Sequence, residues 1–157
     1  LAVGDARGSD IEEELILSKT KDDAGEAMIK NDSVREKLAD WFCEANGLKY
    51  TKFRTISALS KGEAPGPEAS ITKIVSANKL QEIGNFGIDS EDMAGMLIDD
   101  NDGVSSFQGA WLGAPGLRIA GGTDEILRNI IAERVLGLPQ DPRADKGIAF
   151  KDIPTKA

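Results

Sequence analysis

One long run of apolar residues at helical spacing constrains the fold of this chain most strongly. Asn31, Asp32 or Ser33 can cap the start of a helix there, and Gly62 suits the C′ position after its end. At roughly 1.5 Å per residue such a helix is about 40 Å long, and helices of this length bury their apolar face in an antiparallel bundle. The apolar residues recur mostly at steps of three and four, as on one face of an α-helix, and are Val34, Leu38, Trp41, Phe42, Ala45, Leu48, Phe53, Ile56 and Leu59.

Other segments also favour helices. A helix with an acidic first turn is expected from Ser9 to Lys19, and a second from Pro67 at its N1 position to about Gly87. Phe107, Trp111 and Leu112 form a short apolar cluster before "GAPG", and a last helix runs from a cap at Thr123 to a stop at Gly137 and Pro139. Strand alternation and internal repeats are lacking. The sequence therefore predicts an all-α protein with an antiparallel four-helix bundle over residues 1–139 and an extended tail over residues 140–157.

Composition excludes several classes of function. The 157 residues carry a net charge of −8, which argues against nucleic acid or an anionic membrane as a partner, and no apolar run approaches the roughly 20 residues of a membrane span. The single cysteine, Cys43, excludes an internal disulfide and fits a reducing compartment, so we expect a cytoplasmic protein. The chain has no histidine, which removes Ser/His/Asp and Cys/His nucleophilic chemistry. We expect no metal site, because "DDNDG" lacks the spacing and the glutamate of a calcium loop.

The motif Gly121-Gly122-Thr123 allows two interpretations. In the first, the glycines only supply unusual backbone angles and Thr123 only caps a helix. In the second, the missing side chains let a flat or extended ligand lie against the backbone. The acidic residues that follow, Asp124 and Glu125, argue against a bare phosphate there. Elsewhere, the acidic run at residues 12–14 is interpreted as a solvated helix start, and Trp41 and Phe42 as core residues.

Two longer motifs carry a family resemblance. "GEAPGPEASITKIVSA" (residues 62–77) and "IAGGTDEILRNIIAERVLGLP" (residues 119–139) resemble the C-terminal helical domain of acyl-CoA dehydrogenases. The resemblance implies a four-helix bundle that belongs to an FAD enzyme converting acyl-CoA into 2-enoyl-CoA. Electrons would pass to an electron-transfer flavoprotein, and the domain would contribute to the oligomer interface. Since the chain begins at Leu1, we expect a fragment that lacks the family's N-terminal helical domain and middle β-domain, retains no FAD and is inactive alone.

The resemblance also assigns site residues. Many members carry Tyr-Glu-Gly-Thr where this chain has Ala120-Gly121-Gly122-Thr123, and that glutamate is their catalytic base. Gly121 occupies the base position and cannot accept a proton, so no catalytic residue is expected in the chain. The resemblance implies that FAD is contacted at Gly121, Gly122, Thr123 and Glu125, although Glu125 replaces a common glutamine. The family's Arg-x-x-Phe-Gly element is missing, and "NFGIDSEDM" stands where many members carry "FGGNG".

Three hypotheses follow from the glycine at position 121. The favoured one is a competent dehydrogenase whose base lies on an earlier helix, upstream of Leu1. The second is a non-catalytic subunit or assembly module that pairs with a related subunit in a heteromer. The third is a cofactor-free helical interaction bundle, in which both glycines would tolerate bulky residues. Acyl chain length and oligomeric state are not encoded in any motif of the chain.

Overall fold

The computed structural model describes residues 21, 25–64, 66–98, 105–140, 142, 145 and 147–153. Its elements are η1 (Met28–Lys30), α2 (Asp32–Ser60), α3 (Ala69–Ser90), η2 (Asp92–Met96), α4 (Ser106–Ile119), α5 (Asp124–Ile130), the π-helical η3 (Ile131–Val135) and η4 (Phe150–Asp152). Within these ranges no β-strand occurs, only an isolated bridge between Lys21 and Ala27. The predicted all-α helical bundle is confirmed. The helix expected from Ser9 and the "DDNDG" run lie wholly or largely outside the described residues.

Helix α2 begins and ends as its sequence predicts. The Asn31 side chain accepts a hydrogen bond from the backbone N–H of Ser33 at 3.0 Å. At the other end Gly62 has φ +80°, and the N–H groups of Gly62 and Glu63 reach back to the carbonyls of Leu59 and Ala58 at 3.0 and 3.1 Å. This pair of bonds is a Schellman motif, which satisfies carbonyls that the helix itself leaves free.

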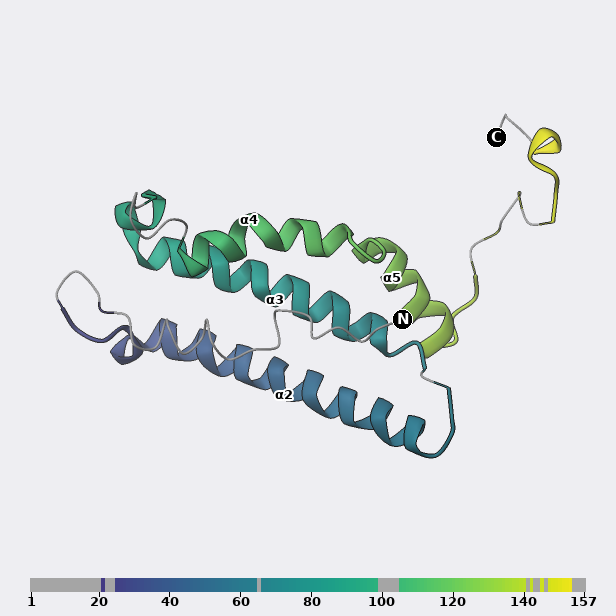
Figure 1. Cartoon of the computed structure of the whole chain (residues 1–157), viewed down its shortest axis with the longest axis horizontal. Helices are drawn as coiled ribbons and strands as arrows, with labels where there is room; N and C mark the ends of the chain where they lie inside the picture. The colour runs from purple at the N-terminus through teal and green to yellow at the C-terminus, as the bar shows by residue number, and fades with distance from the viewer. Residues whose placement is uncertain are drawn as a thin grey trace.

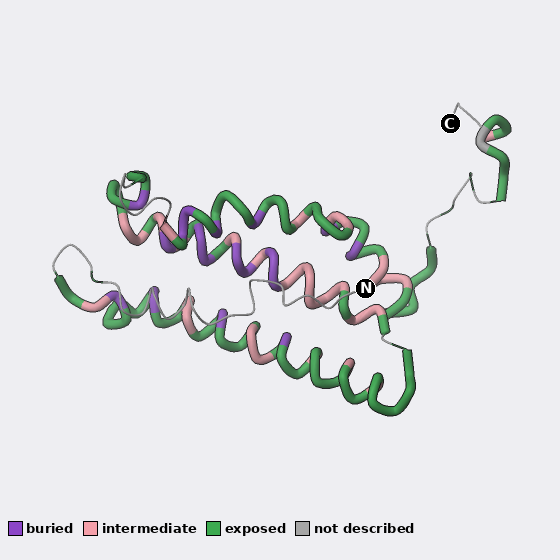
Figure 2. Tube along the Cα trace, in the orientation of Figure 1, coloured by how far each residue is buried: buried purple, intermediate pink, exposed green. Residues whose placement is uncertain are grey.

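Helix α3 is the central element, with α2 on one side and α4 on the other (Figure 1). One core cluster joins all three helices: Trp41 of α2 lies edge-on to Phe86 of α3, with ring centroids 5.7 Å apart, and packs with Ile83 and with Phe107 of α4. Leu80, Ala110 and Ala114 form a second cluster between α3 and α4. Buried residues accordingly gather along α3 and on the surfaces that face it (Figure 2).

Two glycines allow α3 and α4 to approach closely. A Cβ atom on Gly84 would lie 2.7 Å from the backbone nitrogen of Trp111, and one on Gly87 would lie 2.3 Å from the Phe107 ring. Both distances are too short for a real carbon contact. The chain stays helical to Ser90, and Gly87 makes room for the ring of Phe107.

One helix was not predicted, and the predicted start of another was wrong. The apolar cluster before "GAPG" is part of α4, which begins at a capping box between Ser105 and Gln108 and runs through Pro115. Three glycines and a proline within 14 residues lower the helical propensity of this segment, and burial against α3 overrides it. Pro67 is not at N1, because α3 begins at Ala69; Pro67 lies in the preceding turn, where its carbonyl accepts from Ser70 N–H at 3.0 Å.

The apolar face of α2 is buried less than its periodicity suggested. Val34, Trp41 and Leu48 are buried. Phe42, interpreted as a core residue, is 58 % exposed, because its neighbour Trp41 faces α3 and Phe42 is directed away from it. Farther along α2 the predicted apolar positions also remain about half exposed, and they are Phe53, Ile56 and Leu59.

Candidate functional site

The Gly121-Gly122-Thr123 loop joins the end of α4 to the start of α5. Gly121 has φ +70° and Gly122 has φ +115°, both in the region that side chains disfavour. A Cβ atom on Gly121 would meet no heavy atom within 4 Å, so this position is open. Thr123 caps α5 as predicted, accepting from Ile126 N–H at 3.4 Å. The loop therefore presents bare backbone on an open surface.

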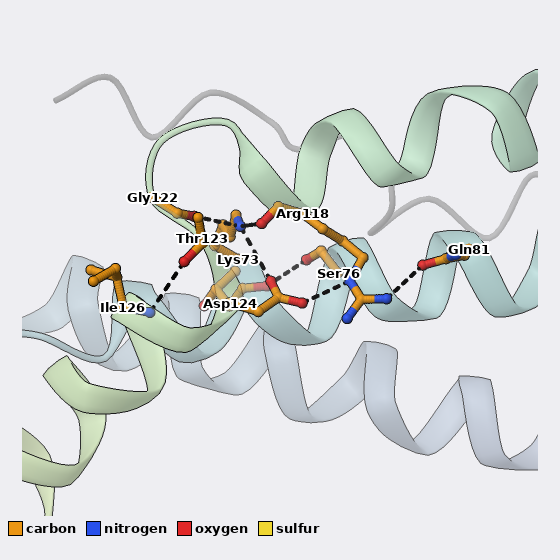
Figure 3. Close-up of polar contacts among 9 residues, drawn as sticks. Lys73, Ser76, Gln81, Arg118, Gly122, Thr123, Asp124 and Ile126 are labelled. Atoms are coloured by element: carbon orange, nitrogen blue, oxygen red, sulfur yellow. Dashed lines mark hydrogen bonds and ion pairs between the residues drawn. The ribbon is translucent and has the colours of Figure 1, made fainter.

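The carboxylate of Asp124, at the end of this loop, is buried between Arg118 and Lys73 (Figure 3). Asp124 has only 3 % of its side chain exposed and accepts from Arg118 Nε at 2.7 Å and from Lys73 Nζ at 3.3 Å. Lys73 comes from α3 and also donates to the backbone carbonyls of Arg118 and Gly122, both at 2.8 Å. Arg118 reaches back to α3 through Gln81 at 2.9 Å. Three helices meet at this cluster.

The two cations decide the charge state of Asp124. Burial alone would raise its pKa, but the hydrogen bonds and charges of Arg118 and Lys73 outweigh that effect and hold the pKa below its ordinary value of 3.8. Asp124 is thus a fixed anion at neutral pH. It is tied to its partners and is not a candidate proton acceptor.

Glu125 is the exposed acid of the loop. Hydrogen bonds from its own backbone N–H and from the Thr123 hydroxyl lower the pKa of Glu125, which makes it a weaker base. With Thr123 and Asp124 it borders an open depression of about 280 Å³, whose other lining residues are Gln81, Pro115, Arg118 and Ile119. The depression offers hydrogen-bonding side chains and backbone groups to a ligand. Among its described lining residues, no side chain is suited to act as the base that the family carries at position 121.

Sequence reasoning identified the loop and missed its support. Gly121, Gly122 and Thr123 form the loop, and Glu125 follows in the first turn of α5. Asp124 is in the first turn of α5, and no feature of the sequence indicates that its side chain is buried. The partner Lys73 is 51 residues away in sequence, and no local pattern links the two. In the described part of the chain, acidic residues and Cys43 nowhere gather into a metal-binding group of three.

Comparisons with known proteins agree with this picture. The family model described as "Acyl-CoA dehydrogenase, C-terminal domain" matches residues 2–136. The chain is 32 % identical over 108 residues to the acyl-CoA dehydrogenase IpdE1 of Mycolicibacterium smegmatis and 37 % identical over 110 residues to IpdE1 of Mycobacterium tuberculosis. These matches cover 69 % and 70 % of the chain but only 26 % and 28 % of the relatives.

Solved structures share the fold. The ChsE4-ChsE5 complex from Mycobacterium tuberculosis matches with a TM-score of 0.66 and 26 % identity, over 83 % of this chain and 34 % of that one. The FAD complex of PigA matches with a TM-score of 0.64 and 23 % identity, over 82 % and 32 %, a likeness of fold alone. The chain belongs to the acyl-CoA dehydrogenase C-terminal domain family, and it spans about a quarter of the length of the curated relatives it matches. Each helix in the described ranges is too short or too polar for a membrane span.

Proposed function

We propose that this chain is the C-terminal domain of an FAD-dependent acyl-CoA dehydrogenase, which converts acyl-CoA into 2-enoyl-CoA and passes electrons to an electron-transfer flavoprotein. The domain would cover residues 1–139, with a tail at 140–157, and the match of the family model to residues 2–136 supports that division. The single cysteine favours a reducing compartment such as the cytoplasm. The chain alone would be inactive, because a quarter of the relatives' length holds only part of a flavin and substrate site.

The observation that carries the proposal is the open, side-chain-free loop at Gly121 and Gly122. Both glycines have positive φ, and no heavy atom lies within 4 Å of a Cβ built on Gly121. A flat cofactor can approach such backbone without steric hindrance, so the residues fit FAD in this respect. Gly121, Gly122, Thr123 and Glu125 would contact FAD, whose flavin, when bound, supplies the hydride acceptor. A protein of this fold, PigA, forms an FAD complex, which supports FAD as the cofactor of the full-length parent.

An absorbance spectrum of the purified full-length parent, titrated with acyl-CoA substrates, tests the proposal. A flavin band that one class of acyl-CoA bleaches would establish a competent dehydrogenase with its base outside position 121. A protein without flavin would contradict the proposal and favour a cofactor-free bundle.

Two observations favour a second function. Gly121 stands where many members carry the basic glutamate, and a heteromeric assembly of this fold, the ChsE4-ChsE5 complex, is among the similar structures. The chain would then belong to a non-catalytic subunit that binds a related partner and helps to hold its FAD. In the titration above, a bound flavin that no acyl-CoA reduces would support this alternative.

A further inference from the structure

Lys73 uses its whole hydrogen-bonding capacity on the segment that carries the glycine loop. A lysine ammonium has three N–H donors. In this structure Lys73 Nζ has three acceptors: the Arg118 carbonyl at 2.8 Å, the Gly122 carbonyl at 2.8 Å and Asp124 Oδ1 at 3.3 Å. The three acceptors lie at the end of α4, in the loop and at the start of α5 (Figure 3). Lys73 of α3 therefore bonds to the start, the middle and the end of the turn that joins α4 to α5.

Two of these contacts satisfy groups at the ends of the turn, and at Asp124 Lys73 shares the role of counter-charge with Arg118. The Arg118 carbonyl belongs to the last turn of α4, where carbonyls have no partner within the helix and a cation is favourable. Asp124 is 3 % exposed on its side chain and needs compensating charge. Lys73 is itself 24 % exposed on its side chain, so solvent competes weakly for its protons.

The bond to Gly122 fixes the direction of one peptide group. No cis peptide occurs in the described chain, so the carbonyl of Gly122 and the N–H of Thr123 point to opposite sides of a planar unit. Because the carbonyl points toward Lys73, the Thr123 N–H points away from α3. Rotation of this peptide changes ψ of Gly122, which a glycine tolerates, and φ of Thr123, which is −67°. The bond from Lys73 adds to the restraint that Thr123 already places on this orientation.

We propose that Lys73 is a positioning residue, which locks the Gly122–Thr123 peptide with its N–H directed away from α3. Its effect on cofactor binding rests on the proposed function, in which this loop contacts FAD. Lys73 itself would touch neither cofactor nor substrate. Its charge would act through Asp124 and through the two carbonyls.

Hydrogen exchange in the full-length parent tests the lock directly. In Lys73→Met we expect exchange of the amides in residues 119–126 to speed up about tenfold or more, because the turn loses three bonds at once. The amides of residues 34–48 in α2 should keep their wild-type rates. The matched control is Lys37→Met, which removes an ion pair between α2 and α3. In that pair Lys37 Nζ lies 2.6 Å from Glu82 Oε1, and the two side chains are 40 % and 46 % exposed.

Unchanged exchange in residues 119–126 would overturn the proposal. Faster exchange throughout the domain would overturn it as well, because Lys73 would then serve stability in general. If Lys73→Met does not fold, Lys73→Gln keeps an amide donor without the charge, and the same local increase is expected.

The FAD affinity of the same variants separates this inference from the proposed function. We expect the Kd for FAD to rise about tenfold in Lys73→Met and to stay unchanged in Lys37→Met. If exchange in the loop speeds up but the Kd for FAD is unchanged, Lys73 still holds the Gly122–Thr123 peptide, but this restraint plays no part in FAD binding. A wild-type parent without flavin would overturn the proposed function, whereas the exchange rates would still decide on the lock.

Discussion

Gly121 shows how a single residue sets the shape of the loop. Its φ of +70° lies in the left-handed region, and an added Cβ would meet no heavy atom within 4 Å. Backbone strain is therefore the main cost of a side chain at this position. A glutamate there, as in many family members, would carry the same strain in this backbone conformation.

Gly121→Ala should lower the free energy of unfolding by about 1 kcal/mol, because a left-handed backbone disfavours any Cβ. Urea denaturation measures this change. Gly113→Ala is the matched control, since Gly113 is exposed within α4 and its added Cβ also meets nothing within 4 Å. We expect this control to raise stability by about 0.5–1 kcal/mol. Equal effects of the two substitutions would contradict a backbone origin.

Asp124 gives the domain a specific acid sensitivity. Its folded-state pKa is below the ordinary value of 3.8, since Arg118 and Lys73 outweigh the effect of burial. A carboxylate with a depressed folded pKa contributes stability that is complete above the unfolded pKa and is lost as the pH falls through the folded pKa. The contribution of Asp124 is therefore intact at pH 5 to 7 and is lost progressively as the pH falls below 3.8.

Asp124→Asn should cost about 2 kcal/mol at pH 7, a value reduced for the partial exposure of both cations. The difference from the wild type should shrink as the pH falls below 3.8. Urea unfolding at pH 7, 5 and 3 measures it. The control Glu82→Gln removes the exposed pair with Lys37 and should cost less than about 1 kcal/mol at pH 7. A penalty for Asp124→Asn that persists undiminished at pH 3 would show that the charge is not the cause.

Among the helices, the contact between α3 and α4 depends most on small residues. The two backbones approach so closely at Gly84 that a Cβ there would lie 2.7 Å from the Trp111 nitrogen. A backbone atom cannot rotate away as a side chain can. The helices must therefore separate to admit a methyl group.

Gly84→Ala should destabilise the domain by about 1–3 kcal/mol, the usual cost of overpacking, despite the better helix propensity of alanine. The thermal midpoint of the domain measures this effect, again with Gly113→Ala as the control. A higher thermal midpoint for Gly84→Ala would contradict the close approach of α3 and α4 at this position.

Local sequence signals predicted some of these elements and failed for others. The cap at Asn31 and the glycine at 62 marked α2 because capping depends on residues close in sequence. Helix α4 was missed because Pro115 and three glycines lower its intrinsic propensity, and its stability comes from packing against α3. The glycine loop was found from its own residues. The contacts of Lys73 with this loop were not predicted, because Lys73 and Asp124 meet only after the chain has folded.

At the scale of the whole molecule, many large apolar side chains of the described residues are exposed. Residues of α3, η2, α4 and the segment after η2 border an apolar groove of about 450 Å³. Its lining includes Met96, Ile98, Trp111 and Leu112, which are 75 %, 65 %, 49 % and 63 % exposed. Contiguous apolar surface of this kind marks an interaction site. In an oligomeric parent, as proposed above, this groove would be covered by another subunit.

Leu112→Glu in the full-length parent should therefore shift the protein to a smaller species, because a charge buried at an apolar interface is costly to desolvate. Light scattering coupled to size-exclusion chromatography measures the mass. Ser57→Glu adds the same charge to an exposed position of α2 and should leave the mass unchanged. Helix α2 lies on the other side of α3 from α4 (Figure 1). If Leu112→Glu keeps the wild-type mass, the groove lies outside the interface between subunits. If Ser57→Glu alone dissociates the parent, the exposed face of α2 is the interface instead.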